Sequence, residues 1–139
     1  MKSINNIIFE INYFYMVVID LALKNFIEKN AIGFATVNKD GMPHNIAVAD
    51  VKVLKDNIII SNLHIKESIE NLEFNSIVSL VVWNKNWEKS CVGFELIGIA
   101  KNYTNGKWLK FVENLPENRG CKVISAILVK IKKIKKLLS

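Results

Sequence analysis

The feature most able to support chemistry is a lysine at the start of a short expected helix. Lys66 falls in the first turn of a helix expected over residues 65–73, directly after a strand that ends near Ser61 and Asn62. A lysine is unfavourable at the positive end of a helix dipole, and a bound anion reverses that effect. Backbone N–H groups, the Lys66 ammonium and the hydroxyls of Ser61 and Ser68 could therefore hold a phosphate. The alternative is that Lys66 simply points into solvent or pairs within its helix.

Small side chains gather on two strands that an Asp40-Gly41 turn is expected to join. Gly33 and Ala35 share one face of the first strand because side chains alternate along a strand. Ala47 and Ala49 share one face of the second strand for the same reason. If the two faces coincide, they form a flat shelf for a planar ring, as a phosphorylated aromatic cofactor requires. Close packing beneath a helix is the alternative.

Other catalytic signatures are absent from the sequence. There is no dinucleotide-binding or P-loop glycine motif and no nucleophile elbow. His44 and His64 are the only histidines, and neither lies at metal-ligand spacing to Cys91 or Cys121. We therefore expect no metal site and name no catalytic side chain, and both cysteines are interpreted as buried structural thiols.

Composition describes one ordinary globular domain. The chain has 139 residues, of which 50% are hydrophobic and 23% are charged, which excludes wholesale disorder. Two cysteines are too few for a disulfide scaffold, so we expect a reducing, cytoplasmic compartment.

The positive charge is concentrated near the C-terminus. The net charge is +6, and five lysines lie within residues 130–136, so the rest of the chain carries only +1. A nucleic-acid-binding protein usually spreads its positive charge over a face, and Arg119 is the only arginine. We therefore expect no nucleic-acid partner.

The N-terminal extension over residues 1–19 is rich in Ile, Phe and Tyr. Glu10, Asn12 and Asp20 interrupt the apolar run, whereas a membrane span needs about 20 mostly apolar residues. We therefore expect no membrane role and interpret the extension as a segment packed on the domain or on a partner subunit. Another possibility is that Met16 is the natural start.

The remaining residues, 20–139, are expected to form one mainly β domain with a basic C-terminal tail over 130–139. Short turns between the strands favour an antiparallel barrel over βαβ units. Asp20 is the expected cap of the first helix. The expected strands span residues 31–38, 44–54, 58–61, 77–83, 92–103 and 123–131, and the expected helices are an N-terminal one over 20–30, one over 65–73 and one that includes Trp108 and is closed by Pro116.

The order of five short motifs resembles the pyridoxamine 5'-phosphate oxidase-like family, the FMN-binding split barrels, and is most similar to its small single-domain members. The resemblance extends from about Asp20 to Ile131. The motifs are Ile32–Val37, Asp40–His44, Lys66–Leu72, Ser79–Trp83 together with Gly93–Ala100, and Thr104–Gly106.

The resemblance implies a six-stranded antiparallel split β-barrel that forms a homodimer, with FMN in clefts between the subunits. It places the isoalloxazine ring along the second strand, at Asn45, Ile46, Ala47, Val48 and Ala49. It places the phosphate at Ser61, Asn62, Lys66 and Ser68.

The function implied is a flavoprotein oxidoreductase or electron-transfer protein that works with a small-molecule donor or acceptor. A true pyridoxamine phosphate oxidase is not expected, because the family's arginine-rich substrate segment is missing. A deazaflavin-dependent reductase, a cofactor-free protein and a nucleic-acid-binding barrel using Trp83, Trp87 and Trp108 are the alternatives.

One departure from the family pattern bears on the phosphate. Lys66 precedes Asn71 by one residue more than is usual in the family. If the helix is aligned at Asn71, Glu67 takes the place of the lysine, and a carboxylate there would weaken phosphate binding.

Overall fold

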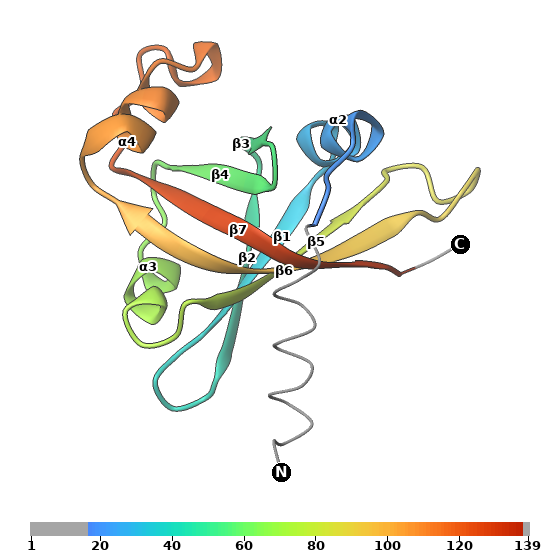
Figure 1. The fold of residues 1–139 in the computed structure, drawn as a ribbon, viewed down its shortest axis with the longest axis horizontal. Helices are drawn as coiled ribbons and strands as arrows, with labels where there is room; N and C mark the ends of the chain where they lie inside the picture. Colours follow the sequence, from blue (N-terminus) through green and yellow to red (C-terminus); the bar gives the residue numbers. More distant parts are fainter. Residues whose placement is uncertain (1–16, 138–139) are drawn as a thin grey trace.

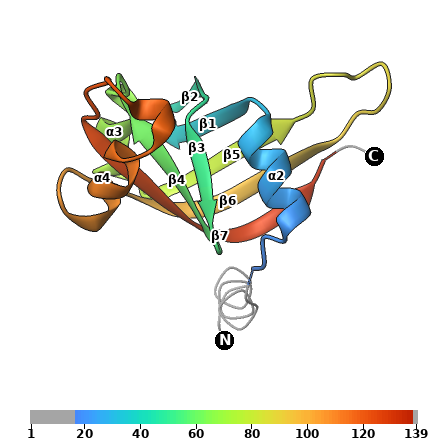
Figure 2. The same cartoon turned by 90° about the horizontal axis from the view of Figure 1, so that it is seen from above.

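A single curled antiparallel sheet forms the body of the molecule (Figures 1 and 2). The computed structural model describes residues 17–137, so residues 1–16 of the expected N-terminal extension lie outside the described part. The sheet has the strand order β2-β1-β5-β6-β7-β4-β3. Its strands are β1 (Ile32–Val37), β2 (Pro43–Val48), β3 (Val51–Leu54), β4 (Asn57–Asn62), β5 (Ile77–Trp83), β6 (Gly93–Tyr103) and β7 (Ser125–Lys136).

Within residues 17–137, three α-helices lie against the sheet, which confirms the mainly β class with short helices. They are α2 (Leu21–Lys29), α3 (Glu67–Leu72) and α4 (Gly106–Glu113), and a 3-10 turn, η1 (Pro116–Asn118), follows α4. Asp20 caps α2 as expected, because its carboxylate accepts a hydrogen bond from the backbone N–H of Leu23 at 2.8 Å.

The expectation of six strands is wrong, because the sheet has seven and forms a half-barrel. The stretch expected as one strand over 44–54 divides at Ala49 and Asp50 into β2 and β3. β2 pairs with β1 at one edge of the sheet, and β3 pairs with β4 at the other. Unbroken alternation of apolar and polar residues predicts extended chain, but it does not say which strand each half pairs with.

The first hairpin is held by a side chain before its turn. The Asn38 side-chain oxygen accepts hydrogen bonds from the backbone N–H groups of Asp40 and Met42, both at 2.9 Å. Gly41 has φ +83°, a conformation that favours glycine. This turn fixes the register between β1 and β2.

β7 is longer than expected and continues through the lysine-rich stretch to Lys136. Its last residues pair with β6, with Lys136 opposite Phe94. A bulge between Ile97 and Gly98 lets the two strands stay paired. A Cβ on Gly98 would overlap the carbonyl oxygen of Lys130, so only glycine fits at this point. The five lysines of residues 130–136 therefore lie on a strand, with their side chains exposed.

The concave side of the sheet encloses the main hydrophobic core. Its fully buried members come from almost every strand, among them Ile32, Phe34, Ile58, Leu80, Leu96 and Ile127.

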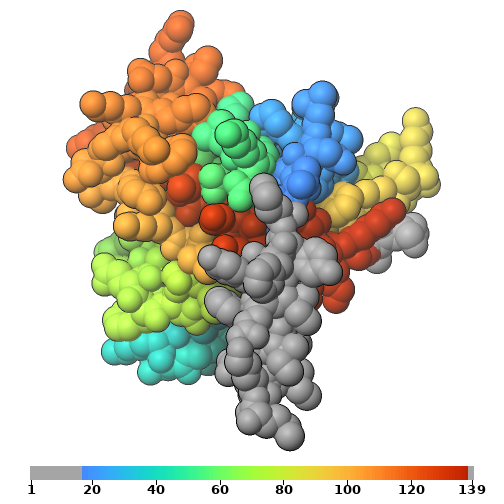
Figure 3. Space-filling view, viewed as in Figure 1, coloured from blue at the N-terminus to red at the C-terminus, as the bar shows by residue number. Residues whose placement is uncertain are grey.

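A smaller apolar cluster lies beneath α4. Ile59, Val112 and Ala126 form its buried centre, and Trp108 packs against them. Trp108 thus belongs to packing, as its helical spacing indicated. Figure 3 shows α4 at one end of the molecule and the segment between β5 and β6, in yellow, projecting at the other. Within residues 17–137, no helix has the length and apolarity needed to cross a membrane.

Candidate functional site

The two small-residue faces coincide, as the shelf requires. Gly33 lies opposite Ala47, and Ala35 lies opposite Asn45, in the register of β1 and β2. Residues directly opposite in an antiparallel pair point to the same side of the sheet. Asn45 and Ala47 are exposed, and Gly33 and Ala35 are half-buried. We call these four residues the ledge.

The floor of the ledge has no spare room at Gly33. A Cβ on this residue would lie 3.0 Å from Val81 Cγ1 on the neighbouring strand and 3.4 Å from the side-chain oxygen of Asn45. The Asn45 amide therefore borders the space above Gly33 and offers a hydrogen-bond donor and an acceptor at the edge of the ledge.

The five predicted ring contacts on the second strand divide between two faces. Asn45 and Ala47 belong to the ledge. Ile46 and Val48 point to the opposite face, where both pack with the main core. Ala49 follows the end of β2 and, together with Ala47 and Val48, lines a cavity of about 310 Å³.

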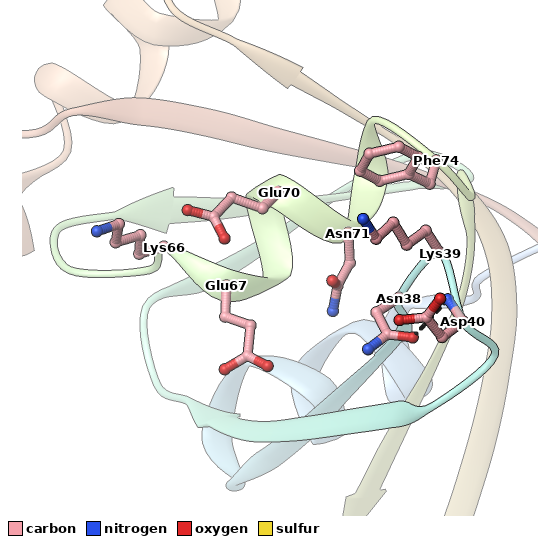
Figure 4. A pocket seen from close by; sticks show the side chains of 8 residues that line it. All are labelled: Asn38, Lys39, Asp40, Lys66, Glu67, Glu70, Asn71 and Phe74. Carbon is pink, nitrogen blue, oxygen red and sulfur yellow. Dashed lines mark hydrogen bonds between the residues drawn. The ribbon is translucent and has the colours of Figure 1, made fainter.

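A second cavity, of about 600 Å³, lies between α3 and the first hairpin (Figure 4). Figure 4 shows Lys66 at one end of this cavity, with its ammonium directed away from Lys39 and Asp40 at the other end. Lys66 precedes α3, and its side chain is exposed and does not cap the helix. The lining residues are Asn38, Lys39, Asp40, Lys66, Glu67, Glu70, Asn71 and Phe74.

The charges around this cavity do not favour an anion. Two lysines lie among three carboxylates, so the lining carries a formal charge of −1. Glu67, the residue that family alignment would put in place of the lysine, is 63% exposed and lies 3.5 Å from His44. A phosphate dianion would be repelled by such carboxylates.

Ser61 and Asn62 direct their side chains into the protein. The Ser61 hydroxyl accepts a hydrogen bond from the Asn118 amide at 2.9 Å. The Asn62 amide nitrogen donates to the Ser125 hydroxyl at 2.8 Å, and its oxygen accepts from the backbone N–H of Ile65 at 2.6 Å. These hydrogen bonds connect β4 to β7, to η1 and to the loop before α3. Ser61 and Asn62 therefore stabilise the fold.

Ser68 is fully buried in α3, and its hydroxyl has no hydrogen-bond partner in the described part of the chain. A buried unpaired hydroxyl carries a free-energy cost. The predicted phosphate set therefore does not converge as one group: Ser61 and Asn62 are engaged internally, Ser68 is enclosed, and Lys66 is on the surface.

Sequence reasoning did not identify two contacts near α3. The Asn71 amide donates to the Thr36 hydroxyl at 3.0 Å and joins α3 to β1 in the interior. His44 and Glu67 approach each other between β2 and α3. The asparagine of the Asn71-Leu72 motif was noted only as part of a resemblance, and no local pattern pointed to Thr36.

Among residues 17–137, no three His, Cys, Asp or Glu side chains lie close enough together to hold a metal ion. The expectation that both cysteines are buried is wrong for Cys121, which is exposed because it lies in the loop between η1 and β7. Cys91 is half-buried, and both are free thiols.

No protein-family model and no curated protein matches this sequence. Solved structures do match. HupZ from Group A Streptococcus has a TM-score of 0.78 at 18% identity, over 87% of this chain and 95% of that one. An FMN-binding protein from Syntrophomonas wolfei has a TM-score of 0.71 at 15% identity, over 84% of each chain. A Clostridium acetobutylicum protein of the pyridoxinephosphate oxidase family has a TM-score of 0.66 at 14% identity, over 86% and 91%.

The chain has the pyridoxamine 5'-phosphate oxidase-like split-barrel fold. This confirms the split-barrel fold that the sequence resemblance implied, except for the number of strands. At these identities the likeness concerns the fold alone, and proteins of this fold differ in what they bind. HutZ, the heme storage protein from Vibrio cholerae, also shares the fold, with a TM-score of 0.62 at 14% identity over 88% and 95% of the two chains.

The residues of this split barrel fit the two parts of FMN unequally. The ledge suits a planar ring, because Gly33, Ala35 and Ala47 are small and the Asn45 amide lies at its edge. The predicted phosphate residues do not suit a dianion, because two of them bond internally and the nearby cavity is lined by more carboxylates than lysines.

Proposed function

We propose that this split barrel is a flavoprotein that binds FMN, with the isoalloxazine ring lying on the ledge. The observation that carries the proposal is the register of β1 and β2, which brings Gly33, Ala35, Asn45 and Ala47 to one open face. Larger side chains at these positions would keep a ring away from the strand backbones. The Asn45 amide can meet the polar edge of a flavin, which has hydrogen-bond donors and acceptors of its own.

We also propose that the ledge is covered by a second copy of the chain. The same face of the sheet continues across β5 and β6, where Ile77 and Ile99 lie opposite each other and are 60% and 40% exposed. Exposed apolar side chains beside a ligand surface favour association. Two copies facing each other would shield both rings from water.

The proposed activity is oxidation or reduction of a small molecule, or electron transfer to one. FMN, when bound, supplies the hydride or electron chemistry, and the protein supplies binding and orientation. No ledge residue is a histidine or a cysteine. His44 precedes Asn45 on β2, but it lies opposite Thr36, on the other face of the strand, so we assign no catalytic side chain.

The test is the absorbance of the protein purified under mild conditions, followed by titration with FMN. Bound flavin gives a band at about 450 nm, and light scattering should report a dimer. A protein that takes up neither FMN nor a deazaflavin would contradict the proposal.

Hemin is the competing ligand, because HutZ has the same fold. A parallel titration with hemin decides between the two. Tight binding of hemin together with no binding of flavin would assign the ledge to a tetrapyrrole.

A further inference from the structure

We infer that Lys29 and Lys85 hold the anionic group of the ligand, at the end of the ledge, and that Lys66 does not. The inference rests on the proposed function, because it takes the ring to lie on the ledge. Its basis is the cavity of about 310 Å³ at this end of the sheet, lined by Glu28, Lys29, Asn30, Ala31, Ala47, Val48, Ala49 and Lys85.

The strand register explains why these residues meet. Ile32, the first residue of β1, lies opposite Val48 at the end of β2 and opposite Val82 near the end of β5. The residues just beyond these points therefore gather at one end of three adjacent strands. Ala47 belongs both to this cavity and to the ledge, so the cavity adjoins the ledge.

The charged side chains that line this cavity carry a net positive charge. Lys29 and Lys85 are both exposed, and neither forms a salt bridge with another residue in the range 17–137. Glu28 is the only carboxylate in the lining, and it is paired with the ammonium of Lys24. The same Glu28 oxygen accepts a hydrogen bond from the backbone N–H of Val53, at 3.3 Å.

The cavity beside α3 has the opposite balance. Its two lysines face three carboxylates. Of the two cavities, the one at Lys29 and Lys85 is therefore the better place for a negative charge.

The size of the cavity indicates what kind of group it takes. Pockets that enclose whole ligands measure about 300–1,000 Å³. At about 310 Å³ this cavity is at the lower end of that range, which suits a small group such as a phosphate and its linker. Its lining includes three alanines, and its two ammonium groups, on Lys29 and Lys85, outnumber the one carboxylate, Glu28. The ligand class is a phosphate monoester attached to a planar aromatic ring.

The experiment compares FMN with riboflavin, which differ only in the phosphate. The ratio of the riboflavin Kd to the FMN Kd then measures the contribution of the phosphate. We expect a ratio of about tenfold or more in the unaltered protein, which is the effect of a charge-assisted contact. In the double variant K29Q/K85Q the ratio should fall to about one, while riboflavin binds as before.

Two further variants complete the comparison. K39Q/K66Q removes the two lysines of the α3 cavity, and K110Q/K122Q removes two exposed lysines elsewhere. Both should keep the ratio of the unaltered protein. A ratio near one in the unaltered protein, or a ratio lost in K39Q/K66Q, would overturn the inference and leave flavin binding intact.

If the protein binds neither FMN nor riboflavin, the proposed function is overturned. A titration with inorganic phosphate then tests the cavity separately. Phosphate should shift the backbone amide NMR signals of Ala31 and Ala49, and K29Q/K85Q should abolish the shifts. Signals that stay in place would overturn the cavity as an anion site.

Discussion

Gly33 on β1 lies directly opposite Ala47 on β2, and the two residues form the floor of the ledge. This relationship predicts that a large side chain at Ala47 blocks the ring. Ala47→Phe should weaken FMN binding by about tenfold or more, because the phenyl group would occupy the ledge. Stability should change little, since Ala47 is exposed. Fluorescence titration with FMN measures the effect.

Ala22→Phe is the matched control for that variant. Ala22 is an exposed alanine on α2, outside the ledge and outside the cavity lining. The same added volume at Ala22 should leave FMN affinity unchanged. Equal affinities in both variants would remove the ring from the ledge.

Gly98→Ala should destabilise the fold. The new methyl group would overlap the Lys130 carbonyl oxygen and lie 2.9 Å from Val129 Cγ1, so β6 and β7 would have to separate at the bulge. Overpacking of this kind costs about 1–3 kcal/mol. Urea unfolding should show the loss.

Gly93→Ala provides the comparison, because its methyl group would come no closer than 3.3 Å to a neighbouring atom. It should cost clearly less than Gly98→Ala. If the two variants unfold at the same urea concentration, the close approach at Gly98 is not a constraint on stability.

Replacing each of two buried serines with alanine should have different effects on the free energy of unfolding. Ser68→Ala removes a hydroxyl that has no partner, so it should leave the free energy of unfolding unchanged or raise it by about 1 kcal/mol. Ser61→Ala removes the acceptor of the Asn118 amide and should lower the free energy of unfolding by about 1–2 kcal/mol. Thermal or urea unfolding of both variants tests the pair, and a large loss for Ser68→Ala would mean that its hydroxyl has a partner after all.

Lys52 on β3 and Glu117 on η1 predict a pH dependence. The hydrogen bond from Lys52 lowers the pKa of Glu117 below its ordinary value of 4.5. A carboxylate with a lowered pKa stabilises the fold above its unfolded pKa, and the contribution is lost as the pH falls through the folded pKa. The same bond raises the pKa of Lys52 above 10.5, so its contribution is lost only at strongly alkaline pH.

The measurement is the stability difference between the unaltered protein and Lys52→Gln. The difference should be small, since solvent screens the pair, constant from about pH 6 to 9, and smaller below about pH 4. A difference that does not change with pH would show that the ion pair contributes nothing to stability.

Local signals predicted the elements that local contacts determine. Asp20 identified the start of α2, and Asp40-Gly41 identified the first hairpin, because caps and turns depend on a few neighbouring residues. The break at Ala49 and Asp50 was not predictable, because it depends on which distant strand each half pairs with.

The candidate site was predictable in one part. The alternation of small residues predicted that Gly33, Ala35 and Ala47 share a face, and the register of β1 and β2 confirms it. Ala49, the fourth residue of the predicted shelf, falls beyond the end of β2, and Asn45 takes its place in the ledge. The burial of Ser61 and Asn62 was not predictable, because it depends on Asn118 and Ser125, which are distant in sequence. The gathering of Lys29 and Lys85 depends in the same way on three strand ends.

The half-barrel leaves β2 and β3 as the two outermost strands of the sheet. Unpaired backbone groups on such strands can recruit strands from other molecules and start aggregation. β2 opens with Pro43, which lacks the N–H that strand addition needs, and β3 is short and carries Lys52. The protein should therefore stay dispersed at high concentration even with no ligand bound.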